Sequence, residues 1–93
     1  MQQTEKIQRD PDVVARELGG SEGGVLLHLQ TGAYHGMNSV GMLVWELIDG
    51  ERTVADLTAA MRQRVPESPP ELADDIVRFL ERALERGLVH TIP

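Results

Sequence analysis

The chain has 93 residues, of which 41 % are hydrophobic and 26 % charged, so it has the length and composition of one domain with a modest core. Its net charge of −6 argues against a nucleic-acid partner, because phosphate backbones are bound through Lys and Arg, and favours a peptide or protein partner. The sequence has no apolar run close to the roughly 20 residues that a membrane helix needs, and it has neither a secretory signal pattern nor a cysteine. We therefore expect a cytoplasmic protein with no membrane attachment.

The first half of the chain has the pattern of β-strands. In chain order we expect a flexible arm over 1–12, a strand over 13–18, a glycine-rich connection over 19–24, a strand over 25–30 and a strand over 33–37. The connection, GGSEGG, lacks the Lys-Ser/Thr of a phosphate-binding loop, so we interpret it as a flexible hairpin connection.

Two registers compete where the second expected strand turns into the third. A two-residue loop places His28 opposite His35, whereas a three-residue loop with Gly32 left-handed pairs Leu27 with His35. We favour the second, because it places Met37 on the same face as other core residues. The predicted inner face then holds Val25, Leu27, Leu29, His35 and Met37, and the outer face holds Leu26, His28, Tyr34 and Gly36.

Three helices follow, each indicated by apolar residues at helical spacing. The first carries Val40, Leu43, Val44, Leu47 and Ile48, with Asn38 or Ser39 as N-cap and Gly50 just past its end. The second opens with a capping box from Thr53 to Asp56 and stops at Pro66. Its inward residues are Leu57, Ala60, Met61 and Val65.

The third helix is expected to open with Ser68 as cap, Pro69 at its first position and Glu71 completing the box, and to end at Gly87. The apolar stripe of this helix consists of Leu72, Ile76, Phe79, Leu80, Ala83 and Leu84. A short tail over 88–93 follows the helix. Strands first and helices second predict an α+β fold of the winged helix-turn-helix type, a three-stranded antiparallel sheet followed by three helices.

Catalytic and metal-binding chemistry is not indicated. His28, His35 and His90 lack the spacing of a structural zinc site, and there is neither a cysteine nucleophile nor a Gly-x-Ser-x-Gly elbow. We therefore expect no enzyme, no metal and no cofactor.

Two features leave a binding role open. Along the third helix, Asp74, Asp75, Glu81 and Glu85 alternate with Arg78, Arg82 and Arg86, which is typical of a solvated face but also suits the rim of a peptide groove. The third strand, if it lies at a sheet edge, has free backbone groups that can pair with an extended peptide, although most natural edges are merely short and protected.

Two stretches of the chain together resemble the PqqD-like family: LHLQTGAYHGMNSVGMLVWELIDGERTVADL at 27–57 and DDIVRFLERALERGLV at 74–89. The similarity covers about residues 13–90 and is strongest to the stand-alone members of lasso-peptide biosynthesis. The positions that carry it are Leu27, Thr31, Gly32, Tyr34, Gly36, Met37, Asn38, Gly41, Trp45, Leu47, Ile48, Asp49 and Gly50.

The resemblance implies a domain over 13–93 that recognises the leader of a ribosomally made precursor peptide. The leader, of Tyr-x-x-Pro type, would add as an antiparallel strand to the third strand beside the third helix. It would then be presented to a separate cysteine peptidase of transglutaminase-like fold and to an asparagine-synthetase-like cyclase. The candidate peptide-binding residues are Tyr34, His35, Gly36, Met37, Asn38, Asp75, Ile76, Phe79, Leu80 and Ala83.

A winged-helix DNA-binding regulator is the alternative for the same architecture. A DNA reader places a basic stripe on its recognition helix. The second helix has Arg62 and Arg64 only near its end, and the charge of the third is mixed, so we favour the peptide-binding hypothesis.

Overall fold

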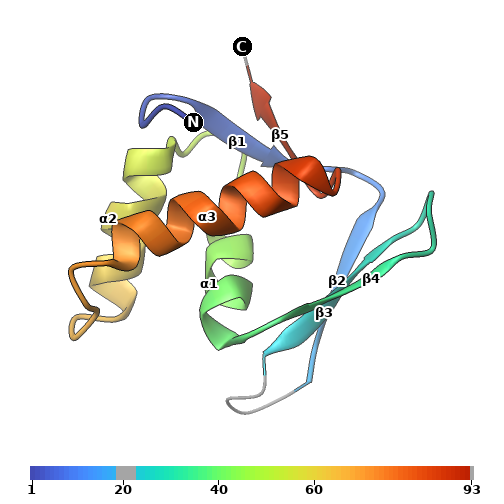
Figure 1. The fold of residues 1–93 in the computed structure, drawn as a ribbon, viewed down its shortest axis with the longest axis horizontal. Coiled ribbons are helices and arrows are strands. Elements are labelled where there is room, and N and C mark those ends of the chain that lie inside the picture. The colour runs from blue at the N-terminus through green and yellow to red at the C-terminus, as the bar shows by residue number, and fades with distance from the viewer. Residues whose placement is uncertain (19–22, 93) are drawn as a thin grey trace.

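A computed structural model describes residues 1–18 and 23–92 and confirms the α+β fold, an antiparallel sheet followed by three helices (Figure 1). The elements are β1 (Lys6–Arg9), β2 (Val13–Glu17), β3 (Gly24–His28), β4 (Tyr34–Met37), α1 (Ser39–Leu47), α2 (Val54–Arg64), α3 (Leu72–Glu85) and β5 (Val89–Ile92). Three strands form the sheet β2-β3-β4, and β1 pairs with β5 in a separate two-stranded ribbon.

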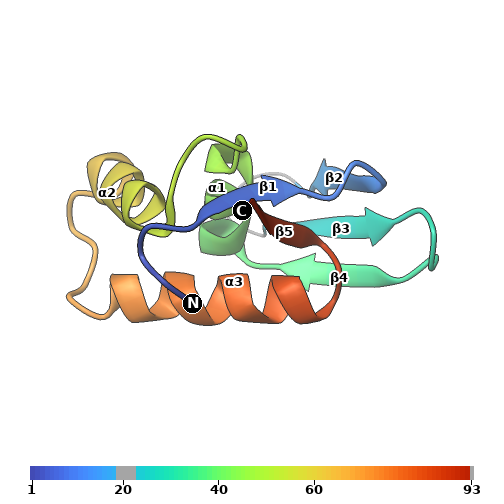
Figure 2. The ribbon, with the colours of Figure 1, turned by 90° about the horizontal axis from the view of Figure 1, so that it is seen from above.

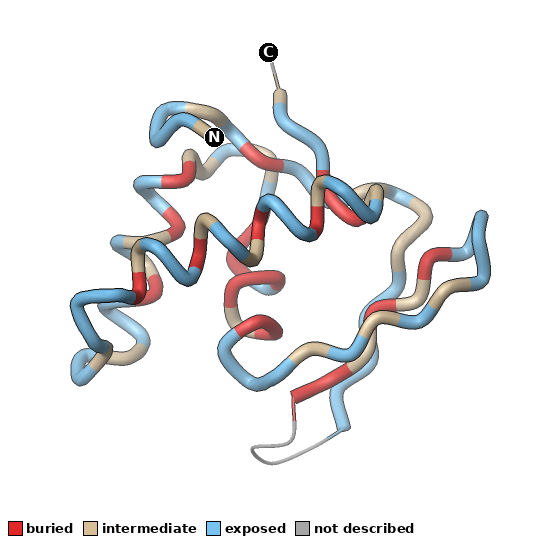
Figure 3. The backbone as a smooth tube through the Cα atoms, viewed as in Figure 1, coloured by how far each residue is buried: buried red, intermediate tan, exposed pale blue. Residues whose placement is uncertain are grey.

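Strand β4 is an edge strand of the three-stranded sheet, and this edge lies on the side of α3 (Figure 2). Viewed from above, the sheet runs β2, β3, β4 toward α3, which passes alongside (Figure 2). Buried positions gather where the three helices face one another (Figure 3), and Leu57, Met61 and Leu80 are completely buried there. In the part of the chain that the structure describes, no helix is both long enough and apolar enough to cross a lipid bilayer.

Local capping explains where the first two helices begin. The Asn38 side chain accepts a hydrogen bond of 2.8 Å from the Gly41 N–H and caps α1, as expected. At α2, the Thr53 hydroxyl accepts from the Asp56 N–H at 3.1 Å while the Asp56 carboxylate accepts from the Thr53 N–H at 3.0 Å. This is the predicted capping box, in which two otherwise free donors are satisfied reciprocally.

The predicted start of the third helix is wrong. Helix α3 begins at Leu72, with Glu71 as an N-cap that makes no side-chain hydrogen bond. Pro69 precedes Pro70, and a residue before proline is disfavoured in the helical conformation, so the helix cannot propagate from Pro69. Instead the Leu72 N–H donates to the Pro69 carbonyl at 3.1 Å in a turn that leads into the helix.

The two ends of the described chain form an element that the sequence analysis did not anticipate. Within 1–12, expected as an arm, strand β1 pairs with β5, which occupies the expected tail. Ile7 of β1 is completely buried in the core, which gives this pairing an apolar anchor. Residues 19–22 of the expected glycine-rich connection lie outside the described residues.

Neither predicted register of the β3–β4 hairpin is correct. Leu27 pairs with Tyr34 and Leu26 with His35, so the loop comprises residues 29–32. Leu26 and His28 are therefore on the inner face with His35, while Leu29, predicted inside, is 59 % exposed in the loop. Gly32 does adopt the expected left-handed conformation, with φ of 74°.

His28 is a buried polar residue, and one of its two ring nitrogens is hydrogen-bonded. Its Nδ1 accepts a hydrogen bond of 3.3 Å from the Gln30 N–H, and its Nε2 lies 4.0 Å from an Asp10 carboxylate oxygen. One hydrogen bond to the ring and a carboxylate nearby reduce the desolvation cost of this polar side chain in the core. The favoured register, chosen to place Met37 with the other core residues, had put His28 on the outer face, and the structure places it on the inner face instead.

Candidate peptide-binding groove

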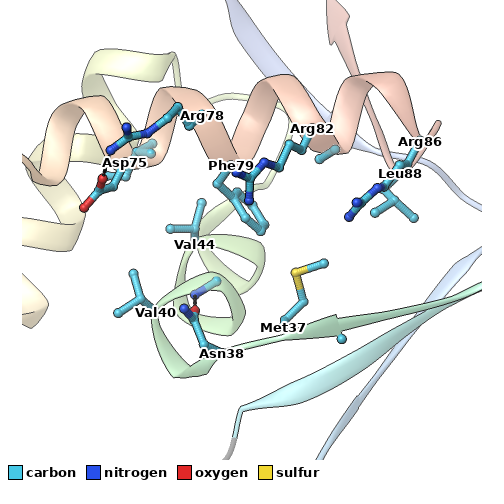
Figure 4. Close-up of a pocket in the computed structure, with 14 residues that line it drawn as sticks. Met37, Asn38, Val40, Val44, Asp75, Arg78, Phe79, Arg82, Arg86 and Leu88 are labelled. Carbon is cyan, nitrogen blue, oxygen red and sulfur yellow. Dashed lines mark hydrogen bonds and ion pairs between the residues drawn. The ribbon is translucent and has the colours of Figure 1, made fainter.

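A groove of about 470 Å³ lies between α3 and the corner where β4 leads into α1 (Figure 4). One wall comes from β4 and α1, the other from α3 and the residues that follow it. The lining consists of Gly36, Met37, Asn38, Val40, Gly41 and Val44 on the first wall, and of Asp75, Ile76, Arg78, Phe79, Arg82, Ala83, Arg86 and Leu88 on the second.

The floor of the groove is apolar. Ile76 and Ala83 are buried, and the half-buried Phe79 ring projects from α3 toward α1 (Figure 4). A Cβ atom on Gly41 would lie only 3.3 Å from the Phe79 ring, so the glycine allows this helix to approach the ring closely. Such a floor suits apolar and aromatic side chains of a ligand.

The free edge of β4 borders the groove. The His28 N–H donates to the Ala33 carbonyl at 3.0 Å, which makes this a hydrogen-bonded pair of the antiparallel ladder. Because such pairs alternate, the backbone groups of His35 and Met37 point to β3 and those of Tyr34 and Gly36 point away from it. Strand β4 pairs only with β3 among the described strands, so these outward groups lie on the free edge of the sheet, the edge nearer α3 (Figure 2).

The charged side chains of the groove come from α3 and its C-cap residue, Arg86, and follow one another at about one helical turn. Arg78 forms an ion pair with Asp75, three residues earlier. Arg82 and Arg86 form no ion pair with any described residue. The lining contains one acid and three arginines and thus has a charge of −1 + 3 = +2, in a chain whose net charge is −6.

Seven of the ten candidate residues line this groove, and three do not. The exceptions are Tyr34, His35 and Leu80. Tyr34 is 73 % exposed and lies on the outer face of the sheet beside Leu27, whereas Leu80 is completely buried in the helical core. The candidates that meet in the groove are Gly36, Met37, Asn38, Asp75, Ile76, Phe79 and Ala83.

Seven lining residues were not among the ten candidates, although the alternating charges of the third helix, arginines included, had been noted as suiting the rim of a groove. The seven are Val40, Gly41, Val44, Arg78, Arg82, Arg86 and Leu88. The arginines carried a usable signal, a spacing of four that places them along one side of a helix. The apolar residues carried none, because their spacing is equally consistent with core packing.

A polar cluster outside the groove joins the two ends of the sequence. The Asp10 carboxylate lies 2.7 Å from the His90 Nε2 and accepts a 2.8 Å hydrogen bond from the Asp12 N–H. The hydrogen bond to His90, followed by that from Asp12, lowers the pKa of Asp10 below its usual value. The described residues include no group of three or more side chains placed to hold a metal ion.

The groove lining contains no serine, cysteine, threonine or histidine. It combines an apolar floor, a cationic rim and a free strand edge. Such a combination binds an extended peptide through backbone pairing, with side chains fitted into the groove.

Comparison with known proteins gives one family match. The model of the family "Coenzyme PQQ synthesis protein D (PqqD)" matches residues 23–89. A PqqA binding protein of Azotobacter vinelandii is 36 % identical over 53 residues, which cover 57 % of this chain and 56 % of that protein. A PqqA binding protein of Pseudomonas fluorescens is 45 % identical over 47 residues, half of each chain. The chain therefore spans about half the length of the curated relatives it matches.

Two solved structures have a similar fold. TbiB1 in complex with the TbiA(beta) leader peptide superposes with a TM-score of 0.73 at 26 % identity, covering 92 % of this chain and 98 % of that one. A lasso peptide synthetase B1 complexed with the leader peptide gives a TM-score of 0.71 at 18 % identity, covering 95 % and 99 %. The second likeness shows the fold alone.

Proposed function

The chain belongs to the PqqD family, and from this premise we propose that it binds the leader of a ribosomally made precursor peptide. The leader adds as an antiparallel strand to β4 and lies in the groove against α3. The protein acts as a binding protein and not as an enzyme. The structure of TbiB1, which is 26 % identical and was solved with a leader peptide, supports this assignment.

One observation carries the proposal: an open strand edge and an apolar groove lie side by side. The outward backbone groups of Tyr34 and Gly36 supply hydrogen bonds to any sequence. Alternate side chains of the added strand then point toward the groove, where they meet Phe79 and its apolar neighbours. Backbone pairing thus provides affinity and the groove provides selectivity.

A leader of Tyr-x-x-Pro type fits these two elements. The tyrosine ring seats against Phe79 on the apolar floor. Three residues of extended chain span about 10 Å, so the proline lies about that far along the leader from the tyrosine that contacts Phe79. Because proline has no N–H to donate to β4, we place it where the pairing of the leader with β4 ends.

The bound leader is presented to other proteins. The groove has no nucleophile of its own, so cleavage and ring closure belong to separate enzymes: a cysteine peptidase of transglutaminase-like fold and an asparagine-synthetase-like cyclase. A lasso peptide is the product implied by the sequence motifs around residues 27–50.

Calorimetric titration with a synthetic leader-like peptide containing Tyr-x-x-Pro, and with its Tyr→Ala variant, tests the proposal. Saturable binding that the variant loses supports it. Failure of every such peptide to bind, together with salt-sensitive binding to duplex DNA, refutes it. Trp45 serves here as a monitor of folding, since it is 3 % exposed, beneath the Arg9 guanidinium, and does not line the groove.

A further inference from the structure

The charge of the groove is distributed unevenly along α3. At the end nearest Val40, Asp75 and Arg78 neutralise each other, whereas Arg82 and Arg86 follow toward Leu88 at the opposite end (Figure 4). No described acidic side chain is within ion-pair distance of Arg82 or Arg86. The groove therefore has two uncompensated guanidinium groups at one end.

We infer that the groove selects leader segments that carry Asp or Glu side chains, and that Arg82 and Arg86 bind those carboxylates. The inference rests on the proposed function, since it concerns the peptide that occupies the same groove. A guanidinium group presents several donors in a planar fork that matches a carboxylate, which makes arginine a specific partner for acidic side chains.

Charge elsewhere on the molecule strengthens this selectivity. The chain as a whole carries −6, so an acidic peptide is repelled by most of the surface, while the groove lining carries +2. A local field of opposite sign orients an approaching charged segment and disfavours other docking positions. An acidic leader is thus directed to the groove and not merely tolerated there.

The polarity of the two elements also predicts where the acids lie in the leader. Strand β4 runs from Tyr34 to Met37 and leads into α1. The N-terminal residues of an antiparallel partner therefore lie at the α1 end of the groove, and its C-terminal residues lie at the other end. That end faces the neutral pair Asp75 and Arg78, and the other end faces Arg82 and Arg86 (Figure 4). The acidic residues are therefore expected in the C-terminal part of the docked segment.

A library of random 12-residue peptides displayed on phage, selected on the wild-type protein, tests the inference. The enriched sequences are expected to carry Asp or Glu in their C-terminal half. A synthetic peptide of the enriched sequence is expected to bind R82Q and R86Q about fivefold more weakly each, and the double variant about twentyfold more weakly. R64Q removes one positive charge from α2, outside the groove, and is the matched control with unchanged binding.

A double-mutant cycle separates recognition from a structural effect of the arginines. Replacing the peptide's acids by Asn or Gln should weaken binding to the wild type but not further weaken binding to the double variant. Enriched peptides that lose binding to G36P yet lack acids, or that bind the double variant normally, overturn the inference and leave the proposed function standing. If no peptide is enriched, or if G36P retains every enriched peptide, the proposed function fails and the inference fails with it.

Discussion

The substitution Gly36→Pro tests strand addition at β4 most directly. The Gly36 N–H points away from β3 and is free to pair with an added strand. Proline removes this donor without removing a hydrogen bond of the existing sheet, and edge strands tolerate proline when the missing N–H faces outward. The domain should therefore remain folded while leader binding is lost.

The expected loss follows from the bond that disappears. A backbone hydrogen bond contributes about 0.5–1.5 kcal/mol net, and an acceptor left without a partner costs a further ~1–3 kcal/mol. A combined loss of about 2 kcal/mol or more weakens the leader affinity at least roughly thirtyfold. Gly36→Ala is the matched control, because a Cβ at this position meets no atom within 4 Å and the N–H is retained.

Calorimetry with the same leader-like peptide measures both variants, and circular dichroism with Trp45 fluorescence verifies that each is folded. The alanine variant should bind within about twofold of the wild type. A folded proline variant with unchanged affinity would refute the assignment of β4 as the docking strand.

Three further predictions concern stability. Ile7→Ala should lower the free energy of unfolding in urea by about 2–4 kcal/mol, because Ile7 is completely buried; a loss below about 0.5 kcal/mol would show that β1 is not part of the core. Thr53→Ala should cost ~1 kcal/mol through loss of the α2 capping box, whereas Thr58→Ala, in the body of the same helix, should cost less; equal losses would contradict the capping argument. Asp10→Asn should lower the Tm at pH 6, and this difference in Tm should shrink below about pH 4. The pKa of Asp10 is lowered in the folded state, so its ionised form stabilises the fold above the unfolded pKa, and this stabilisation is lost as the carboxylate becomes protonated. A difference in Tm that stays constant down to pH 2 would exclude the carboxylate as its source.

The starts of the first two helices could be predicted because their signals are local. Asn38 and the Thr53–Asp56 box define two starts within four residues of sequence. The β1–β5 ribbon could not, since its register joins Ile7 to Thr91 and neither short strand has a strong apolar pattern. The hairpin register failed because the loop has four residues, 29–32, and not the two or three that were considered; Leu26 and Leu27 are both apolar, so alternation did not show which of them faces inward.

The groove was only partly predictable for a related reason. Residues of α3 alternate between core and groove within one turn: Phe79 lines the groove, while Leu80, next in sequence, is completely buried. Apolar spacing alone cannot separate these two roles. Asp75 and Arg78 remain largely exposed, and only the fold shows that they also border the groove.

The open edge of β4 has a consequence for how the protein behaves in a concentrated solution. Two copies could join edge to edge about a two-fold axis, each supplying the backbone partners that Tyr34 and Gly36 of the other lack. Self-association of this kind would occupy the edge of β4 that receives the peptide, so the apparent Kd for the leader would rise as the protein concentration rises. A bound leader would cover the edge of β4 and so keep the chain monomeric and soluble.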